Sequence, residues 1–193
     1  MPENRKPQHR LDPRKPLVLD TRELGRRPGS MRTVRFPAPA PGDLRVELIV
    51  VPPGSEIDLD LRLESVMEGV LVSGTAAVQL AGECGRCLEP VTETLTVDLQ
   101  ELFAYPESTT EATADDEETS VMEGDHLDLE PVLRDAIVLA LPLTPLCRDD
   151  CAGLCAECGE RLDSLPEDHT HELPDARWSA LQDLLDKRTL EEK

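Results

Sequence analysis

Hydrophobic and polar positions alternate along several stretches between residues 16 and 103. In residues 57–63 every odd position is Ile or Leu, and every even position is charged. Residues 91–103 alternate again and are rich in Thr and Val, which favour strands. A period of two is typical of an antiparallel strand with one buried and one wet face. Shorter or less regular patterns predict further strands in residues 16–20, 44–50 and 69–80.

The hydrophobic spacing becomes helical after residue 126. Asp128 is the expected N-cap of a helix over residues 127–141, and Pro142 ends it. Its apolar face is expected to comprise Val132, Leu133, Ala136, Ile137, Leu139, Ala140 and Leu141. A second, shorter helix is predicted from about Pro174, with Trp178 as a core anchor.

Six cysteines and two histidines form the chemical signature of the chain. Four cysteines follow a C-x3-C-x3-C-x2-C pattern, and the other two form a C-x2-C pair at the tip of the hairpin expected between residues 80 and 91. No apolar run follows the N-terminal Met, and no run is long enough to span a membrane, so we expect a cytoplasmic protein. Closely spaced cysteines in a reducing cytosol favour metal ligation over disulfides. The candidate Zn2+ ligands are Cys84, Cys87, Cys147, Cys151, Cys155, Cys158, His169 and His171.

Eight ligands are enough for two tetrahedral zinc ions, but several pairings are open. The favoured one joins Cys84 and Cys87 to Cys147 and Cys151, with Cys155, Cys158, His169 and His171 as a second site. One alternative is a single ion held by the two C-x2-C pairs. Another is a local site made of Cys147, Cys151, Cys155 and Cys158. The His pair has an alternative as well, because the acidic residues around it are also typical of a polar loop.

These patterns predict an α+β fold. It is a mostly antiparallel β-sheet or partly open barrel with one central helix, a Cys-rich zinc-binding segment and a short C-terminal helix. Residues 1–15 are expected to be a disordered basic arm, because they carry almost no apolar side chains. Residues 16–193 are expected to be a single zinc-stapled domain, with a flexible acidic loop at about 106–125.

Charge is distributed unevenly along the chain, whose net charge is −20. Residues 1–45 hold eleven Lys and Arg against five Asp and Glu, and the remaining residues hold nine against thirty-five. The acidic part of the chain after residue 45 is expected to repel phosphate and attract basic proteins. The alternative is that its charge only keeps the protein soluble. Aromatic residues, on which bases stack, make up 2% of the chain. Direct RNA contact is therefore expected only through residues 1–35. The Arg-rich stretch in this region could bind phosphate, and the alternative is that it forms only a solvated loop.

Four segments together resemble the YceD family of large ribosomal RNA subunit accumulation proteins. They are residues 82–90 around the first Cys pair, residues 128–143, residues 146–159 around the Cys cluster, and residues 175–178. The Arg-rich stretch 22–32 looks like the actinobacterial branch of that family. Many members carry Cys-x-Cys after the cluster, where this chain has His169-Thr170-His171. Imidazole can replace thiolate at zinc, so the departure is compatible with ligation.

The resemblance implies a non-catalytic factor that supports 23S rRNA accumulation and large ribosomal subunit biogenesis. The expected partners are components of the pre-ribosomal large subunit, either a basic ribosomal protein or 23S rRNA, with no membrane and no small-molecule substrate. The dense cysteines suggest an alternative, a zinc-thiolate redox-responsive regulator. A zinc hydrolase ranks last, since no catalytic motif accompanies the cysteines.

Overall fold

A computed structural model of the chain describes residues 11–106 and 120–171. The chain divides into two compact units, Met1–Asp149 and Asp150–Lys193, which are described separately. Most of the predicted basic arm and acidic loop lies outside the described residues, as does the helix expected from Pro174. The prediction of a single domain over residues 16–193 stays a prediction.

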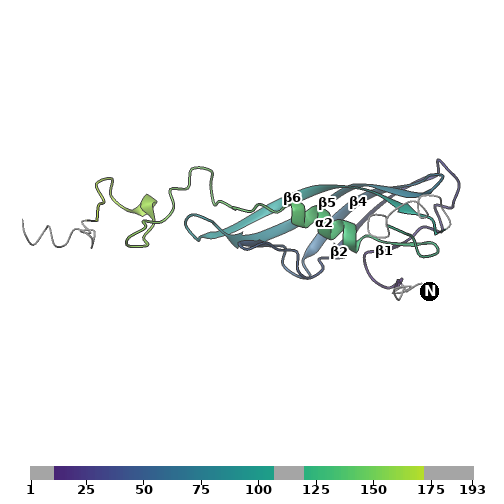
Figure 1. Cartoon of the computed structure of the whole chain (residues 1–193), viewed down its shortest axis with the longest axis horizontal. Coiled ribbons are helices and arrows are strands. Elements are labelled where there is room, and N and C mark those ends of the chain that lie inside the picture. Colours follow the sequence, from purple (N-terminus) through teal and green to yellow (C-terminus); the bar gives the residue numbers. More distant parts are fainter. Residues whose placement is uncertain (1–10, 107–119, 172–193) are drawn as a thin grey trace, which may run out of the picture. The chain divides into compact units, whose positions relative to one another are not determined.

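The first unit is built on a long antiparallel sheet (Figure 1). Its centre is a meander of β4 (Glu56–Ser65), β5 (Gly69–Glu83) and β6 (Pro90–Ala104), in which each strand pairs with the next. Ile57 and Leu59 of β4 are buried while Asp58 between them is exposed. The period of two therefore places one face of the sheet in the core, as predicted.

An unpredicted strand, β2 (Met31–Pro39), extends the sheet beyond β4. Pro37 and Pro39 obscure it in the sequence, because proline cannot donate to a strand ladder. Within the described residues β2 pairs only with β4 and lies at the edge, where the missing N–H groups cost no ladder bond.

Residues 44–50 do not form the continuous strand that was expected. Only β3 (Ile49–Val50) belongs to the sheet, where it pairs with the last residues of β5. The backbone N–H of Val46 donates to the carbonyl of Ile49 at 3.0 Å, and Val51 donates to Leu44 at 2.9 Å. The prediction was wrong because the alternating residues fold back as a tight hairpin.

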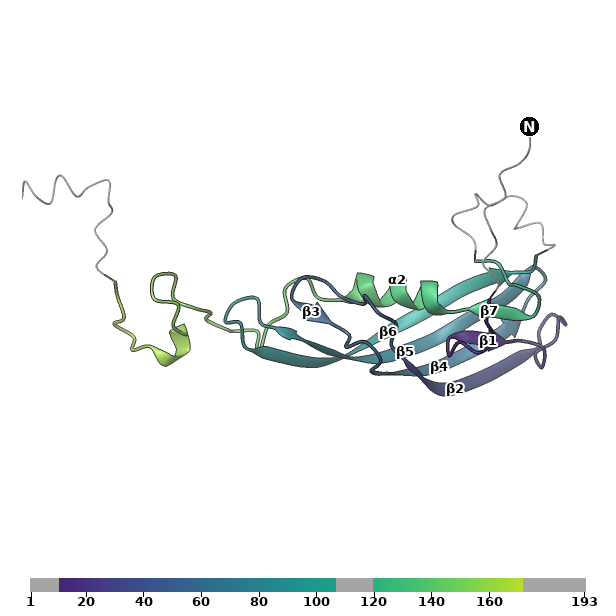
Figure 2. The same cartoon turned by 90° about the horizontal axis from the view of Figure 1, so that it is seen from below.

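One helix and a short strand pair cover the inner face of the sheet. β1 (Val18–Asp20) pairs with β7 (His126–Asp128), and α2 (Glu130–Ala140) follows at once (Figure 2). Leu127 of β7 and Leu133 and Ile137 of α2 are fully buried, in one core cluster with the inner side chains of β4, β5 and β6. The predicted α+β class, with a mostly antiparallel sheet and one main helix, is confirmed.

Two details of α2 differ from expectation. Asp128 belongs to β7 and the N-cap is Leu129, although the Asp128 carboxylate still accepts the N–H of Glu130 at 2.9 Å. The apolar face is narrower than predicted, since Leu139 is 87% exposed and Ala140 is exposed as well. In the part of the chain that the structure describes, no helix is long and apolar enough to cross a membrane.

Candidate metal centres

The first C-x2-C pair lies in the turn that joins β5 to β6, at the tip of the hairpin, as predicted. The strand pairing ends with Glu83 opposite Pro90. In the turn, the N–H of Cys84 donates to the carbonyl of Glu89 at 2.8 Å, and the N–H of Leu88 donates to Cys84 at 2.9 Å. Leu88 has a φ of 61°, the left-handed conformation that reverses the chain.

The second C-x2-C pair repeats this turn, down to a left-handed residue directly after its second cysteine. The N–H of Cys155 donates to Glu160 at 2.7 Å, and the N–H of Gly159 donates to Cys155 at 2.9 Å. Gly159 has a φ of 72°, matching Leu88 in the first turn. Glycine at this position signals the turn, whereas Leu88 conceals it. Both pairs therefore present two sulfur atoms from one turn.

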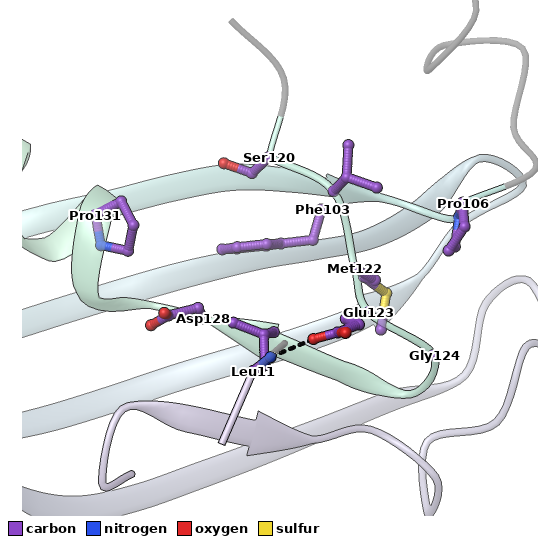
Figure 3. A pocket seen from close by; sticks show the side chains of 10 residues that line it. Leu11, Phe103, Pro106, Ser120, Met122, Glu123, Gly124, Asp128 and Pro131 are labelled. Atoms are coloured by element: carbon purple, nitrogen blue, oxygen red, sulfur yellow. Dashed lines mark hydrogen bonds between the residues drawn. The ribbon is translucent and has the colours of Figure 1, made fainter. Parts of the chain in front are cut away.

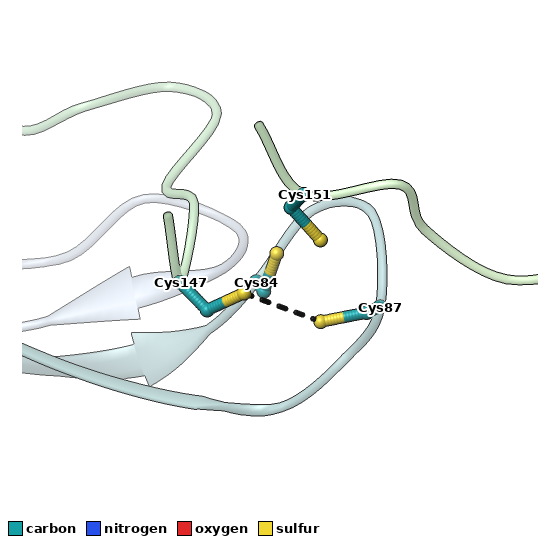
Figure 4. A group of neighbouring side chains, drawn as sticks. All are labelled: Cys84, Cys87, Cys147 and Cys151. Carbon is teal, nitrogen blue, oxygen red and sulfur yellow. Dashed lines mark hydrogen bonds between the residues drawn. The ribbon is translucent and has the colours of Figure 1, made fainter. Parts of the chain in front are cut away.

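The first ligand group comprises Cys84, Cys87, Cys147 and Cys151, whose sulfur atoms all lie within 4.8 Å of one another (Figure 4). The Sγ atoms of Cys87 and Cys147 are 3.6 Å apart. Four thiolates at about 2.3 Å from a tetrahedral zinc ion would be separated by about 3.8 Å. All but Cys147 are buried. The donor set and its spacing therefore fit a closed zinc site.

Backbone contacts hold the turn of Cys84 and Cys87 next to the segment that precedes Cys147. The N–H of Gly85 donates to the carbonyl of Pro145 at 2.8 Å. A Cβ atom at Gly85 would lie 3.1 Å from the side chain of Thr144, so the approach favours glycine. These contacts position three of the four thiols through the backbone of the first unit.

The second ligand group comprises Cys155, Cys158, His169 and His171, whose ligand atoms also lie within 4.8 Å of one another. The Sγ of Cys158 is 3.6 Å from the Nε2 of His169. A thiolate and an imidazole bound to one tetrahedral zinc would be about 3.6 Å apart. The two His rings meet edge to face, with centroids 4.4 Å apart. Cys158 and His171 are exposed, in contrast to the first group.

Hydrogen bonds favour the thiolate form in both groups. Burial raises the pKa of Cys84, but N–H donors from Arg86, Cys147 and Cys87 outweigh it and lower that pKa to about 6. The N–H groups of Cys158 and Glu157, together with the His169 side chain, lower the pKa of Cys155 to about 6. Thiolate is the form that binds zinc, so one cysteine of each pair, Cys84 and Cys155, is suited to metal binding near neutral pH.

A cavity of about 470 Å³ lies elsewhere in the first unit, between the end of β6 and β7 (Figure 3). It is lined largely by apolar side chains such as Phe103 and Met122. Its two carboxylates already accept hydrogen bonds, Glu123 from the N–H of Leu11 and Asp128 from the N–H of Glu130. The Cys and His ligands all lie outside its lining.

Four arginines of the basic N-terminal stretch contact acidic side chains of this chain. Ion pairs join Arg22 to Asp20, Arg26 to Asp125 at 3.5 Å, Arg32 to Glu23 at 2.8 Å and Arg35 to Asp60 at 3.0 Å. The Arg26 guanidinium also lies over the Tyr105 ring, 4.9 Å from its centroid. These contacts favour a structural role for the stretch over phosphate binding.

Comparison with known proteins places this architecture in a family. The model named "Large ribosomal RNA subunit accumulation protein YceD" matches residues 72–185, a span that covers β6, α2 and the second ligand group. The chain belongs to the YceD family. Uncharacterized proteins of Mycobacterium tuberculosis and Mycobacterium bovis are 46% identical to it over 170 residues, covering 88% of this chain and 82% of theirs. An uncharacterized protein of Mycobacterium leprae is 42% identical, with 88% and 78% covered. Comparison with the solved structures gives no match.

Proposed function

We propose that this YceD protein is a non-catalytic factor that supports 23S rRNA accumulation and large ribosomal subunit biogenesis in the cytoplasm. The family match carries the proposal, because the family's name implies a role in accumulation of the large ribosomal subunit. The matched residues include the hairpin tip and the Cys-rich segment, so the family relationship covers the candidate metal centres as well as the sheet.

Zinc, in this proposal, has a structural role. Cys84, Cys87, Cys147 and Cys151 would hold one ion, and Cys155, Cys158, His169 and His171 a second. Each set supplies four protein ligands, the number that a closed tetrahedral site needs. A bound ion would contribute folding free energy and rigidity to the turns that carry its ligands.

The partner would be a component of the pre-ribosomal large subunit, a basic ribosomal protein or 23S rRNA. A basic protein is favoured because the residues after position 45 carry a strong excess of acidic groups. RNA affinity depends on cations facing phosphate, and four arginines of the N-terminal stretch are already paired with carboxylates. Direct RNA contact would then depend on the remaining cations of residues 1–35.

Depletion of the protein from cells would test the assembly role. Ribosomal particles are separated on a sucrose gradient, and 23S and 16S RNA are quantified separately. We expect a selective loss of large subunits and of 23S RNA, restored by the wild-type chain. Balanced subunits with an unchanged ratio of the two RNAs would contradict the proposal. A depletion phenotype limited to oxidative stress would instead favour the zinc-thiolate regulator.

A further inference from the structure

The sheet of the first unit has one covered face and one open face. Side chains that point inward from β4, β5 and β6 pack against α2 and the β1–β7 pair. On the opposite face the polar side chains of β4 and β6 are exposed, among them Asp58, Thr94 and Asp98. We call this opposite face, formed by β2, β4, β5 and β6, the outer face.

The centre of the outer face is a shallow groove with a floor of small side chains. Ser73, Thr75 and Ala77 point outward from β5 and are half-buried. The strand register places Asp60 and Asp98 on either side of Thr75. A cavity of about 410 Å³ runs over this region and is lined by residues that include Arg35, Pro37, Asp58, Asp60, Thr75 and Ala77.

The outer face carries acidic groups without a cationic partner, and one of them, Asp58, lines this groove. Arg35 pairs with Asp60 at 3.0 Å, and Arg62 pairs with Glu64 at 2.7 Å. Among the ion pairs of residues 11–106 and 120–171, none involves the remaining acids of the face, Glu56, Asp58, Glu83 and Asp98. The outer face therefore carries a net negative charge. The small outward side chains of β5 at its centre do not cover the neighbouring carboxylates.

We propose that the outer face is a docking surface for an extended, basic segment of a protein partner. Glu56 and Asp58 lie two residues apart on β4, so their side chains repeat at about 6.8 Å along the strand, and Asp60, which pairs with Arg35, continues the row. An extended peptide with Lys or Arg at alternate positions has the same repeat. Thr75, which lines the cavity, and the half-buried Ser73 leave room for its backbone and offer hydroxyl groups.

This chemistry suits a protein better than a nucleic acid. The unpaired carboxylates repel phosphate. Phe36 is among the residues that line the groove, but it is half-buried and occupies an inward position of β2, and the outward positions of β2, β4, β5 and β6 include no aromatic side chain on which a base would stack. The inference rests on the proposed function and refines it, because it assigns a surface and a charge pattern to the partner.

A binding experiment with the full chain tests the surface. The probe is a fluorescent twelve-residue peptide of alternating Lys and Thr, compared with a peptide of equal composition whose lysines are contiguous and with a twelve-nucleotide RNA. We expect the alternating peptide to bind tightest, and the double variant Asp58→Asn/Asp98→Asn to weaken it about tenfold. The matched variant Asp135→Asn/Glu47→Gln, altered at exposed acids of α2 and of the turn before β3, should weaken it less than about twofold.

Equal losses in the two variants would overturn the proposal, since binding would then follow net charge alone. Tighter binding of the RNA than of either peptide would also overturn it. In cells, the Asp58→Asn/Asp98→Asn variant should fail to restore 23S RNA after depletion. If depletion itself leaves the subunits balanced, the assembly role fails. If depletion lowers 23S RNA and this variant restores it fully, only the docking surface is refuted.

Discussion

Replacing Cys87 with Ser is the sharpest test of the first candidate zinc site. The Cys87 side chain is 5% exposed, and its sulfur lies 3.6 Å from that of Cys147. A serine hydroxyl has a pKa far above that of a thiol and does not supply the thiolate that zinc requires. The variant would leave three thiols facing an incomplete coordination sphere.

The expected magnitude follows from the donor count. Structural zinc sites contribute apparent binding free energies of about 10–16 kcal/mol, and one ligand in four accounts for about 2.5–4 kcal/mol of this. For a protein of this size each kcal/mol lowers Tm by about 2–4 °C, so the variant should melt about 10 °C below the wild type. Binding that is weaker by this amount should also lower the zinc content of the purified variant, by up to one ion per chain.

Zinc content by mass spectrometry and thermal unfolding by circular dichroism measure both effects on the same sample. Cys158→Ser is the matched control, because Cys158 is exposed and belongs to the second ligand group. It should also lose one zinc ion, but it should leave the main transition, which reports the sheet, within about 2 °C of the wild type. A Cys87→Ser protein with wild-type zinc content and Tm would refute the structural role of the first site.

Two further predictions concern the turns. Leu88→Gly should stabilise the protein by about 0.5 kcal/mol in urea unfolding, because relief of the left-handed strain at φ 61° slightly exceeds the entropy lost with glycine. Leu88→Val should destabilise it, and a loss above about 1 kcal/mol in the glycine variant would show that Leu88 makes stabilising contacts. A chelator such as 4-(2-pyridylazo)resorcinol should remove zinc in two phases of one ion each, the faster from the second group, where Cys158 and His171 are exposed. A single phase, or a fast phase that persists in Cys158→Ser, would contradict this order.

Local patterns predicted much of the first unit because its central strands are amphipathic. A strand with one buried face must alternate, and β4 does so over its whole length and β6 over its central residues 94–100. The same rule failed for residues 44–50, where an alternating run folds into a tight hairpin, and only its second arm, β3, pairs with β5. It missed β2, because the prolines that argue against a central strand are acceptable at an edge.

The sequence alone determined that the chain holds two C-x2-C turns, a strand meander, an acidic body and eight candidate zinc ligands. It left the pairing of those ligands open, because spacing along the chain does not fix which distant segments meet. Only the tertiary structure decided that Pro145 approaches Gly85, which brings Cys147 beside a turn sixty residues earlier in the chain. It alone revealed that Leu88 adopts a glycine-like conformation and that Asp60 of β4 and Asp98 of β6 flank Thr75 on the outer face of the sheet. These features depend on strand register and packing between segments far apart in sequence, which periodicity does not encode.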